Sequence, residues 1–188
     1  MPVFLLTVID NIAFLKYNNY GGSKMNNITV LCLGSMDMRP VENNDCSSFL
    51  INEHVLIDCG TSPAINLLNA GVDLKKIDSV VFTHMHMDHC VGFASFIFLL
   101  RTRKIDHSKL TVYGPKGEIV NFIDRTFNYL GLKKEGNYPT VIELEEDCLT
   151  LPQGDLTMYS TPAQHAVKGV CLKFEAGEKT LGYSADTA

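Results

Sequence analysis

The apolar positions of the chain fall in short runs, and two kinds of pattern recur among them. Continuous runs rich in Val, Ile and Leu, closed by turn-forming residues, indicate buried strands. Such runs predict strands at 26–34, 48–51, 54–58, 77–83, 110–113, 141–144, 156–160, 169–175 and 180–184. Longer apolar segments with helical spacing, or with a helix-start signal before them, indicate helices. They predict helices at 63–69, 93–103 and 118–130.

The order of these elements indicates the fold class. Predicted strands alternate with predicted helices as far as residue 130, and only strands follow from Val141 onward. This order is typical of a mixed α/β domain built from stacked layers. Because the first strand follows directly on Met25, we interpret residues 25–188 as the domain and residues 1–24 as an N-terminal extension. The alternative is that residues 1–24 add an edge strand or a helix to the domain.

The composition supports a folded domain and limits its partners. The chain has 188 residues, of which 46% are hydrophobic, and this is enough for a sizeable core. Its formal net charge is −5, from 16 basic and 21 acidic residues, so the protein offers no general electrostatic attraction to nucleic acid or to an anionic membrane. We expect no membrane partner. An anionic substrate, RNA included, must be held by local groups.

Neither a membrane anchor nor a secretory signal is predicted near the first residues. The apolar run Val3 to Ile9 is interrupted by Asp10, is too short to span a bilayer and has no basic residue before it. The cysteines are scattered without a Cys-x-x-Cys pair, so we expect reduced, mostly buried thiols in a cytoplasmic protein. These six cysteines are Cys32, Cys46, Cys59, Cys90, Cys148 and Cys171.

The segment Thr83-His84-Met85-His86-Met87-Asp88-His89 carries the strongest chemical signal in the chain. His84 and His86 are separated by one residue, so in an extended segment they project to the same side and can bind one ion. Asp88 and His89 follow at once and can face a second ion. Imidazole suits zinc and similar ions, and a carboxylate adds a charge-compensating ligand. The segment follows a predicted buried strand, where α/β sheets present functional loops.

The segment Thr83 to His89, followed by Gly92, resembles the His-x-His-x-Asp-His signature of the metallo-β-lactamase superfamily. The resemblance implies an αββα sandwich and a site for two divalent metal ions, with zinc as the first expectation and manganese or iron as alternatives. It extends to Leu56-Ile57-Asp58-Cys59-Gly60. There it implies that Asp58 supports the histidine loop by fixing the orientation of an imidazole.

Two downstream segments resemble the parts of the superfamily that carry further ligands. His165 follows a predicted strand and resembles the third histidine of the first metal site. Residues 181–187 resemble a strand that ends in a Ser-Gly-Asp-Thr turn, which implies that Asp186 bridges both ions; Ala185 stands in place of the usual glycine. The ligands implied by the resemblance are His84, His86, Asp88, His89, His165 and Asp186.

The resemblance also implies a mechanism. Two divalent ions carry about +4, Asp88 and Asp186 about −2 and a bridging hydroxide about −1, which leaves a site near +1 that suits anionic esters. The ions would lower the pKa of the bridging water from about 15.7 to roughly 7 and stabilise charge on the attacked phosphoryl or carbonyl oxygen. Asp88 would also be catalytic, because it could orient the water or accept its proton.

The stretch 165–175 is similar to the corresponding stretch of ribonuclease Z-like members of the superfamily. We therefore expect a metal-dependent hydrolase that acts on a small-molecule or nucleotide phosphodiester. Cleavage of pre-tRNA at its 3′ side is a minority alternative. Many such enzymes hold the tRNA body with a long basic arm between the third histidine and the bridging aspartate, and the interval from His165 to Asp186 is too short for one. A thioester or lactone hydrolase, a catalytically incomplete metal-binding module and a homodimer also stay open.

The chain ends at Ala188, two residues past Asp186, whereas the superfamily fold continues to a last histidine on the second ion. We therefore expect the C-terminal part of the fold to be missing from this sequence and an apolar sheet face to be left uncovered. His54 and His107 lie in no matching context and are expected at the surface. The small basic groups at 101–104 and 133–134 are likewise expected to be solvated.

Overall fold

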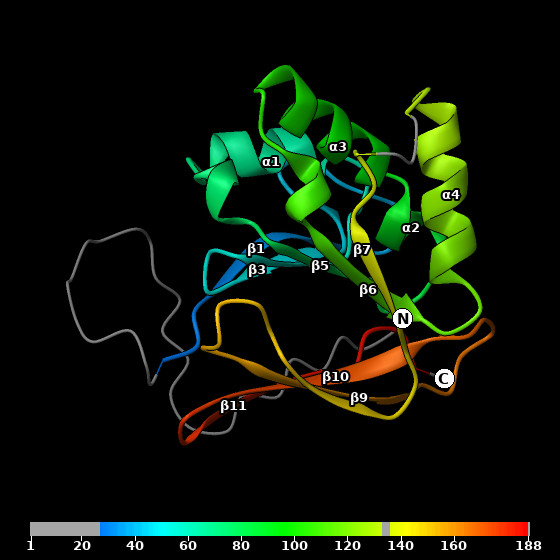
Figure 1. Ribbon diagram of the computed structural model, residues 1–188. Coiled ribbons are helices and arrows are strands. Elements are labelled where there is room, and N and C mark those ends of the chain that lie inside the picture. The colour runs from blue at the N-terminus through cyan, green and yellow to red at the C-terminus, as the bar shows by residue number, and fades with distance from the viewer. Residues whose placement is uncertain (1–26, 133–135, 188) are drawn as a thin grey trace.

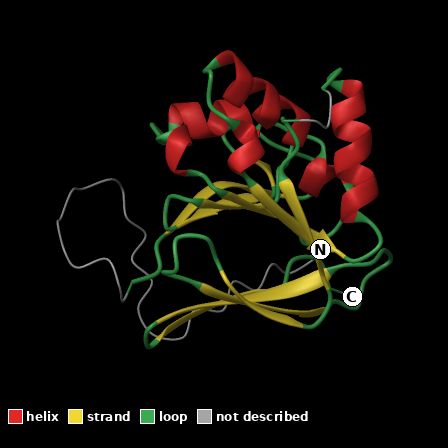
Figure 2. Cartoon of the chain, in the orientation of Figure 1, coloured by secondary structure: helices red, strands yellow, loops and turns green. Residues whose placement is uncertain are grey.

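Two β-sheets lie face to face, and helices cover the outer face of one of them (Figures 1 and 2). The computed structural model describes residues 27–132 and 136–187. The predictions for residues 1–24 and for Lys133 and Lys134 lie outside the described residues. Within them, the layered α/β class expected from the order of elements is confirmed, with one layer of helices and two layers of strands.

The larger sheet has seven strands in the order β2-β1-β3-β4-β5-β6-β7. Its strands are β1 (Val30–Met36), β2 (Asp45–Cys46), β3 (Ser48–Ile51), β4 (Val55–Ile57), β5 (Ser79–Val81), β6 (Thr111–Pro115) and β7 (Thr140–Leu144). Strands β4 to β7 are parallel, and β3 pairs antiparallel with β1 and β4. Strands β3, β4 and β5 are buried along their whole length, because helices cover one face and the second sheet covers the other.

The smaller sheet is antiparallel and has the order β11-β10-β9-β8. Its strands are β8 (Asp147–Thr150), β9 (Thr157–Pro162), β10 (Val170–Ala176) and β11 (Lys179–Tyr183). Along β10, buried residues alternate with residues that are more exposed, as expected for a strand with one face on a core. The outward positions carry polar groups such as Tyr159, Lys173 and Glu175, which contact one another. The expectation of an uncovered apolar face is therefore wrong for this sheet.

The helices lie on the larger sheet and are α1 (Pro63–Asn69), α2 (Met87–Cys90), α3 (Phe93–Thr102) and α4 (Ile119–Tyr129). Single 3-10 turns occur at Leu74–Lys76 and His107–Lys109. None of the helices in the described ranges is long and apolar enough to cross a membrane. One core cluster lies between these helices and the larger sheet, around Phe82, Phe93 and Phe96, and the other fills the space between the sheets, around Ile57 and Phe174.

The predicted strands and helices are all present, with ends shifted by a few residues. The elements that sequence reasoning did not predict are β2, β8 and α2, which have two to four residues and are too short to show a periodic pattern. Strands β3 and β4 form an antiparallel hairpin, and its turn contains Asn52 and Glu53, whose φ angles are positive at 47° and 66°. Two such residues are typical of a type I′ turn, which matches the twist of its flanking strands.

The expectation that His54 and His107 lie at the surface is wrong, because the structure buries both. The His54 side chain is 1% exposed and connects the sheets: its Nδ1 lies 3.2 Å from Asp78 Oδ1 and its Nε2 lies 2.9 Å from Asp155 Oδ1 in an ion-pair contact. His107 packs against the ring of Phe127. The basic group at 101–104 is exposed, as predicted.

The cysteines are free, and the prediction that most are buried is only half right. Cys46, Cys59 and Cys90 are buried and Cys171 is partly exposed. The two remaining cysteines, Cys32 and Cys148, are exposed.

The contacts of His54 predict a pH-dependent contribution to stability. Burial by itself lowers the pKa of His54, but the hydrogen bond with Asp78 and the charges of Asp155 and Asp78 outweigh it and raise the pKa above its usual value. A raised pKa in the folded state stabilises the fold fully below the unfolded pKa of about 6.5, and this stabilisation is lost as the pH rises through the raised value.

We therefore expect His54→Gln to lower the free energy of unfolding by about 2 kcal/mol near pH 6, the usual contribution of a hydrogen bond to a charged group. The difference from the parent chain should shrink as the pH rises from 6 through the raised pKa of His54. Urea unfolding of both proteins in the presence of EDTA measures this difference without a contribution from metal. A difference that stays constant over this pH range would contradict the assignment of the stabilisation to the protonated imidazole.

Candidate metal centre

The predicted site residues meet at one edge of the sandwich, where loops from both sheets converge. Asp58 and the segment 83–89 follow the carboxyl ends of the adjacent parallel strands β4 and β5. His165 follows β9 and Asp186 follows β11, in the smaller sheet. The sheets are joined at this edge by a bridge between His84 and Gly169, and the Val170 N–H donates to the Thr83 carbonyl at 2.9 Å.

Three imidazoles and one carboxylate form the first group of candidate ligands. His86 Nδ1 lies 3.0 Å from His84 Nε2 and 3.0 Å from His165 Nε2. One potential ligand atom from each of His84, His86, His165 and Asp186 lies within 4.8 Å of all the others. Three histidine nitrogens and a carboxylate oxygen are a donor set that zinc and similar divalent ions prefer.

A second group shares Asp186 with the first and adds Asp88 and His89. His89 Nε2 lies 3.6 Å from Asp186 Oδ1 and 3.8 Å from Asp88 Oδ2. Both His89 Nε2 and Asp186 Oδ1 are buried without a hydrogen-bond partner among the described residues. Buried polar atoms are rarely left without partners, and these two face the position where a cation would lie between them. The donor set therefore fits a pair of divalent ions that share Asp186.

Asp58 is fully buried and orients His89 through a hydrogen bond. His89 Nδ1 lies 2.7 Å from Asp58 Oδ2. Because an ionised carboxylate only accepts hydrogen bonds, the proton is assigned to Nδ1 and the lone pair of Nε2 faces the ligand group. The Thr83 N–H and hydroxyl also donate to Asp58, each at 2.8 Å. Asp58 has a φ angle of 54°, an uncommon backbone conformation for a residue other than glycine.

The electrostatic environment differs between the two groups. Burial, followed by the charges of the neighbouring histidines, lowers the pKa of His84 to about 3. The imidazole is therefore neutral at neutral pH, and a nitrogen lone pair is free to bind a cation. Burial also lowers the pKa of His89, but Asp58, by its charge and its hydrogen bond, and then Asp186 and Asp88 outweigh it and raise this pKa above the usual value. The carboxylates that raise it would attract a metal cation for the same reason.

Gly92 allows the loop of Asp58 and the histidine segment to pack backbone against backbone. Its N–H donates to the Gly60 carbonyl at 2.8 Å, and a Cβ added at Gly92 would lie 2.2 Å from that same oxygen. The Cys59 N–H also donates to the His89 carbonyl at 2.6 Å. The glycine that follows the signature is therefore needed for a close approach of two backbones.

The structure gives a role in this site to three polar residues for which the sequence predicted none. The hydroxyl of Thr83 binds Asp58, and the hydroxyl of Tyr183 lies 2.9 Å from Ser47 Oγ and 3.4 Å from Asp58 Oδ2. The signal available for Tyr183 is its inward position on a strand, since a buried phenol requires a hydrogen-bond partner. Ser47 carries no comparable signal in the sequence.

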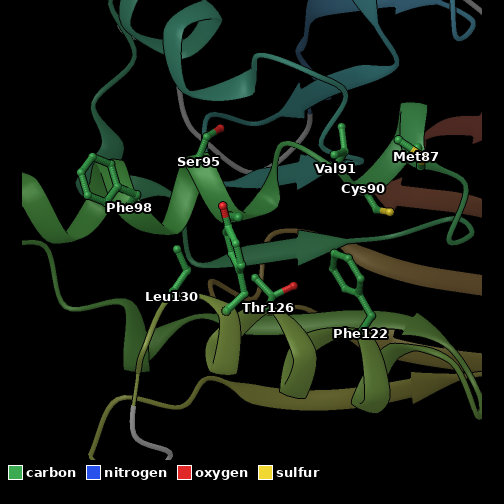
Figure 3. Close-up of a pocket in the computed structure, with 10 residues that line it drawn as sticks. Met87, Cys90, Val91, Ser95, Phe98, Phe122, Thr126 and Leu130 are labelled. Carbon is green, nitrogen blue, oxygen red and sulfur yellow. The ribbon is translucent and has the colours of Figure 1, made fainter.

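A groove of about 720 Å³ lies between α3 and α4, lined mainly by apolar side chains from these helices and α2 (Figure 3). Met87 contributes to it from the histidine segment. None of the histidine and aspartate side chains of the two ligand groups lines it. The candidate metal centre is therefore separate from this groove.

The geometry agrees with the comparison to known protein families. The family model described as the metallo-beta-lactamase superfamily matches residues 42–187. The chain belongs to the metallo-β-lactamase superfamily, whose fold implies divalent metal binding. Within that superfamily it resembles proteins named ribonuclease Z.

The resemblance to ribonuclease Z covers most of this chain but a smaller share of its relatives. The chain is 34% identical over 168 residues to Ribonuclease Z of Clostridium botulinum (strain Eklund 17B), covering 84% of this chain and 50% of that protein. It is 30% identical over 122 residues to Ribonuclease Z of Borrelia duttonii, covering 61% of this chain and 36% of that protein. The chain therefore spans half or less of the length of these two relatives.

Solved structures show the same fold. The metallo-beta-lactamase fold protein YhfI from Bacillus subtilis superposes with a TM-score of 0.67 at 26% identity, covering 85% of this chain and 62% of that one. The short form of human tRNase Z superposes with a TM-score of 0.63 at 18% identity, covering 80% of this chain and 66% of that one. The likeness to the human protein is evidence of a shared fold.

Proposed function

We propose that this chain carries the metal centre of a hydrolase that cleaves a phosphodiester with two divalent ions, zinc being the first expectation and manganese or iron the alternatives. The observation that carries the proposal is the pair of ligand groups that share Asp186, with buried atoms of His89 and Asp186 that lack partners among the described residues. The proposed metal ligands are His84, His86, Asp88, His89, His165 and Asp186.

The side chains of this chain would position and activate the reactants. When bound, a pair of divalent ions lowers the pKa of water from about 15.7 to roughly 7 and stabilises negative charge on the attacked group. Burial keeps His84 neutral, and Asp58 holds the tautomer of His89. Asp88 is buried beside His89, and we assign it the additional catalytic role of orienting the attacking water and accepting its proton.

Charge and similarity both favour a phosphodiester over an uncharged ester. Lys168 is exposed three residues after His165 and has no ion pair with any residue in the described ranges. Its Nζ lies 3.6 Å from the position of a Cβ added at Gly117, in the loop after β6. Together with the resemblance to proteins named ribonuclease Z, this local positive charge supports a nucleotide or RNA phosphodiester as the substrate class, with pre-tRNA as one member.

Metal content and substrate preference test this proposal together. We expect the metal-free chain to take up two zinc ions and then to hydrolyse bis-p-nitrophenyl phosphate faster than a thioester or a lactone. Manganese and iron loading should be compared in the same assay. Binding of one ion or none without turnover would contradict the hydrolase and favour a metal-binding module. Turnover of the thioester or the lactone alone would contradict the phosphodiesterase.

A further inference from the structure

A buried chain of hydrogen bonds connects the smaller sheet to the candidate metal centre. Tyr183 lies at the end of β11, and its hydroxyl is 2.9 Å from Ser47 Oγ and 3.4 Å from Asp58 Oδ2. The same oxygen of Asp58 lies 2.7 Å from His89 Nδ1. All four side chains are buried. The chain therefore runs from Ser47 through Tyr183 and Asp58 to an imidazole of the second ligand group.

The direction of these hydrogen bonds follows from the chemistry of the groups. The Asp58 carboxylate only accepts, so the phenol of Tyr183 donates to it. The phenol oxygen is then left to accept the proton of Ser47. Burial, with the charge of Asp58 as the next cause, raises the pKa of Tyr183 well above its usual value, so the phenol keeps the proton that it donates.

Packing holds the phenol in this position. The ring of Tyr183 makes an edge-to-face contact with Phe49 of β3, with centroids 5.3 Å apart. The hydroxyl is thus presented from the smaller sheet to an acceptor on the larger one. Asp186 follows Tyr183 by three residues in the same chain segment. The end of β11 therefore places a candidate ligand and, beside the two donors of Thr83, a further donor to the Asp58 carboxylate.

We propose that Tyr183 is a positioning residue of the metal centre, whose hydroxyl, oriented by Ser47, holds the Asp58 carboxylate against His89. The inference rests on the proposed metal centre. It goes beyond that proposal in assigning the orientation of His89 to a residue of the opposite sheet. It also predicts that the ligand group of Asp88, His89 and Asp186 is the one that depends on Tyr183, because Asp58 bonds His89 directly. Among the described residues Asp58 has no direct hydrogen bond to the three histidines of the other group, and it reaches His84 only through the Thr83 hydroxyl, which lies 3.2 Å from His84 Nδ1.

Cobalt titration tests this dependence without relying on turnover. The metal-free parent chain and Tyr183→Phe are titrated with Co²⁺, and the visible absorption is followed in competition with a chelator. We expect Tyr183→Phe to bind one of two ions about 10- to 100-fold more weakly, the usual effect of removing a partner that orients a ligand, and to bind the other ion as the parent does. Ser47→Ala should weaken the same ion by a smaller factor.

Tyr159→Phe is the matched control. Tyr159 lies in the same sheet but on its outer face, and its hydroxyl donates to Glu175 at 2.9 Å. It should leave both cobalt affinities unchanged.

The possible outcomes separate this inference from the proposed metal centre. A parent chain that binds no cobalt would overturn the metal centre itself. A parent chain that binds two ions, with unchanged affinities in Tyr183→Phe, would overturn the positioning role even if the variant were less stable. An equal loss at both ions would also overturn it, because that pattern reports a general loosening of the fold. If Tyr183→Phe does not fold by circular dichroism, Ser47→Ala decides between the same outcomes.

Discussion

Replacing His86 by alanine or Asp186 by asparagine is expected to abolish metal-dependent hydrolysis and to leave a folded chain. His86 Nδ1 lies 3.0 Å from a nitrogen of each of its two histidine neighbours, and Asp186 belongs to both ligand groups. A divalent ion contributes several kcal/mol of stabilisation to the transition state, and each 1.36 kcal/mol is a factor of ten in rate. We therefore expect the rate to fall on the order of a thousandfold or more in either variant.

The two variants should differ in metal content. His86→Ala removes a ligand from one group, whereas Asp186→Asn removes a charged ligand from both, so the asparagine variant should retain less metal. Metal analysis after dialysis, activity on bis-p-nitrophenyl phosphate and circular dichroism measure the three effects. Asp106→Asn, at an exposed turn that belongs to neither ligand group, is the control and should keep both metal and activity. Retained hydrolysis in His86→Ala or Asp186→Asn would remove the basis for this site.

Phe82→Ala is expected to lower the free energy of unfolding by about 3–5 kcal/mol, the usual cost of removing a fully buried aromatic ring. Phe82 is 0% exposed and directly precedes Thr83, at the end of β5. Its ring makes edge contacts with Phe93 of α3 and Phe122 of α4, both at centroid distances of 5.3 Å. The substitution would therefore leave a cavity where two helices meet the larger sheet.

The exposed Phe98 provides a matched control for this substitution. It lies on α3 with Phe93, but it is 61% exposed on the wall of the groove in Figure 3. Phe98→Ala should change the free energy of unfolding by no more than about 0.5 kcal/mol. Urea unfolding of both variants in EDTA measures the free energy of unfolding without a contribution from metal binding. Similar losses in the two variants would contradict the placement of Phe82 at the centre of the core.

The local patterns of the sequence carry much of the fold and the core of the site. Each predicted strand or helix of about four or more residues is present, because burial on one or two faces imposes a period that a short window of sequence reveals. The segment 83–89 can also be recognised from a short window of sequence, because its four candidate ligands lie within six residues. His165 and Asp186 were reached by resemblance to a family, and the structure brings both to that segment.

Tertiary structure alone decided the features that depend on residues far apart in the chain. Asp58 and Tyr183 are 125 residues apart, and no local spacing indicates that they share a hydrogen bond. The burial of His54 also depends on distant residues, because one of its two carboxylate neighbours, Asp155, lies in the turn between β8 and β9 of the other sheet. A short stretch of sequence predicts which side chains are buried. The hydrogen-bond partner of a buried polar group, however, depends on how the layers pack against each other. For this protein, the sequence by itself determined the elements and the candidate ligands, and the packing of two sheets decided what orients them.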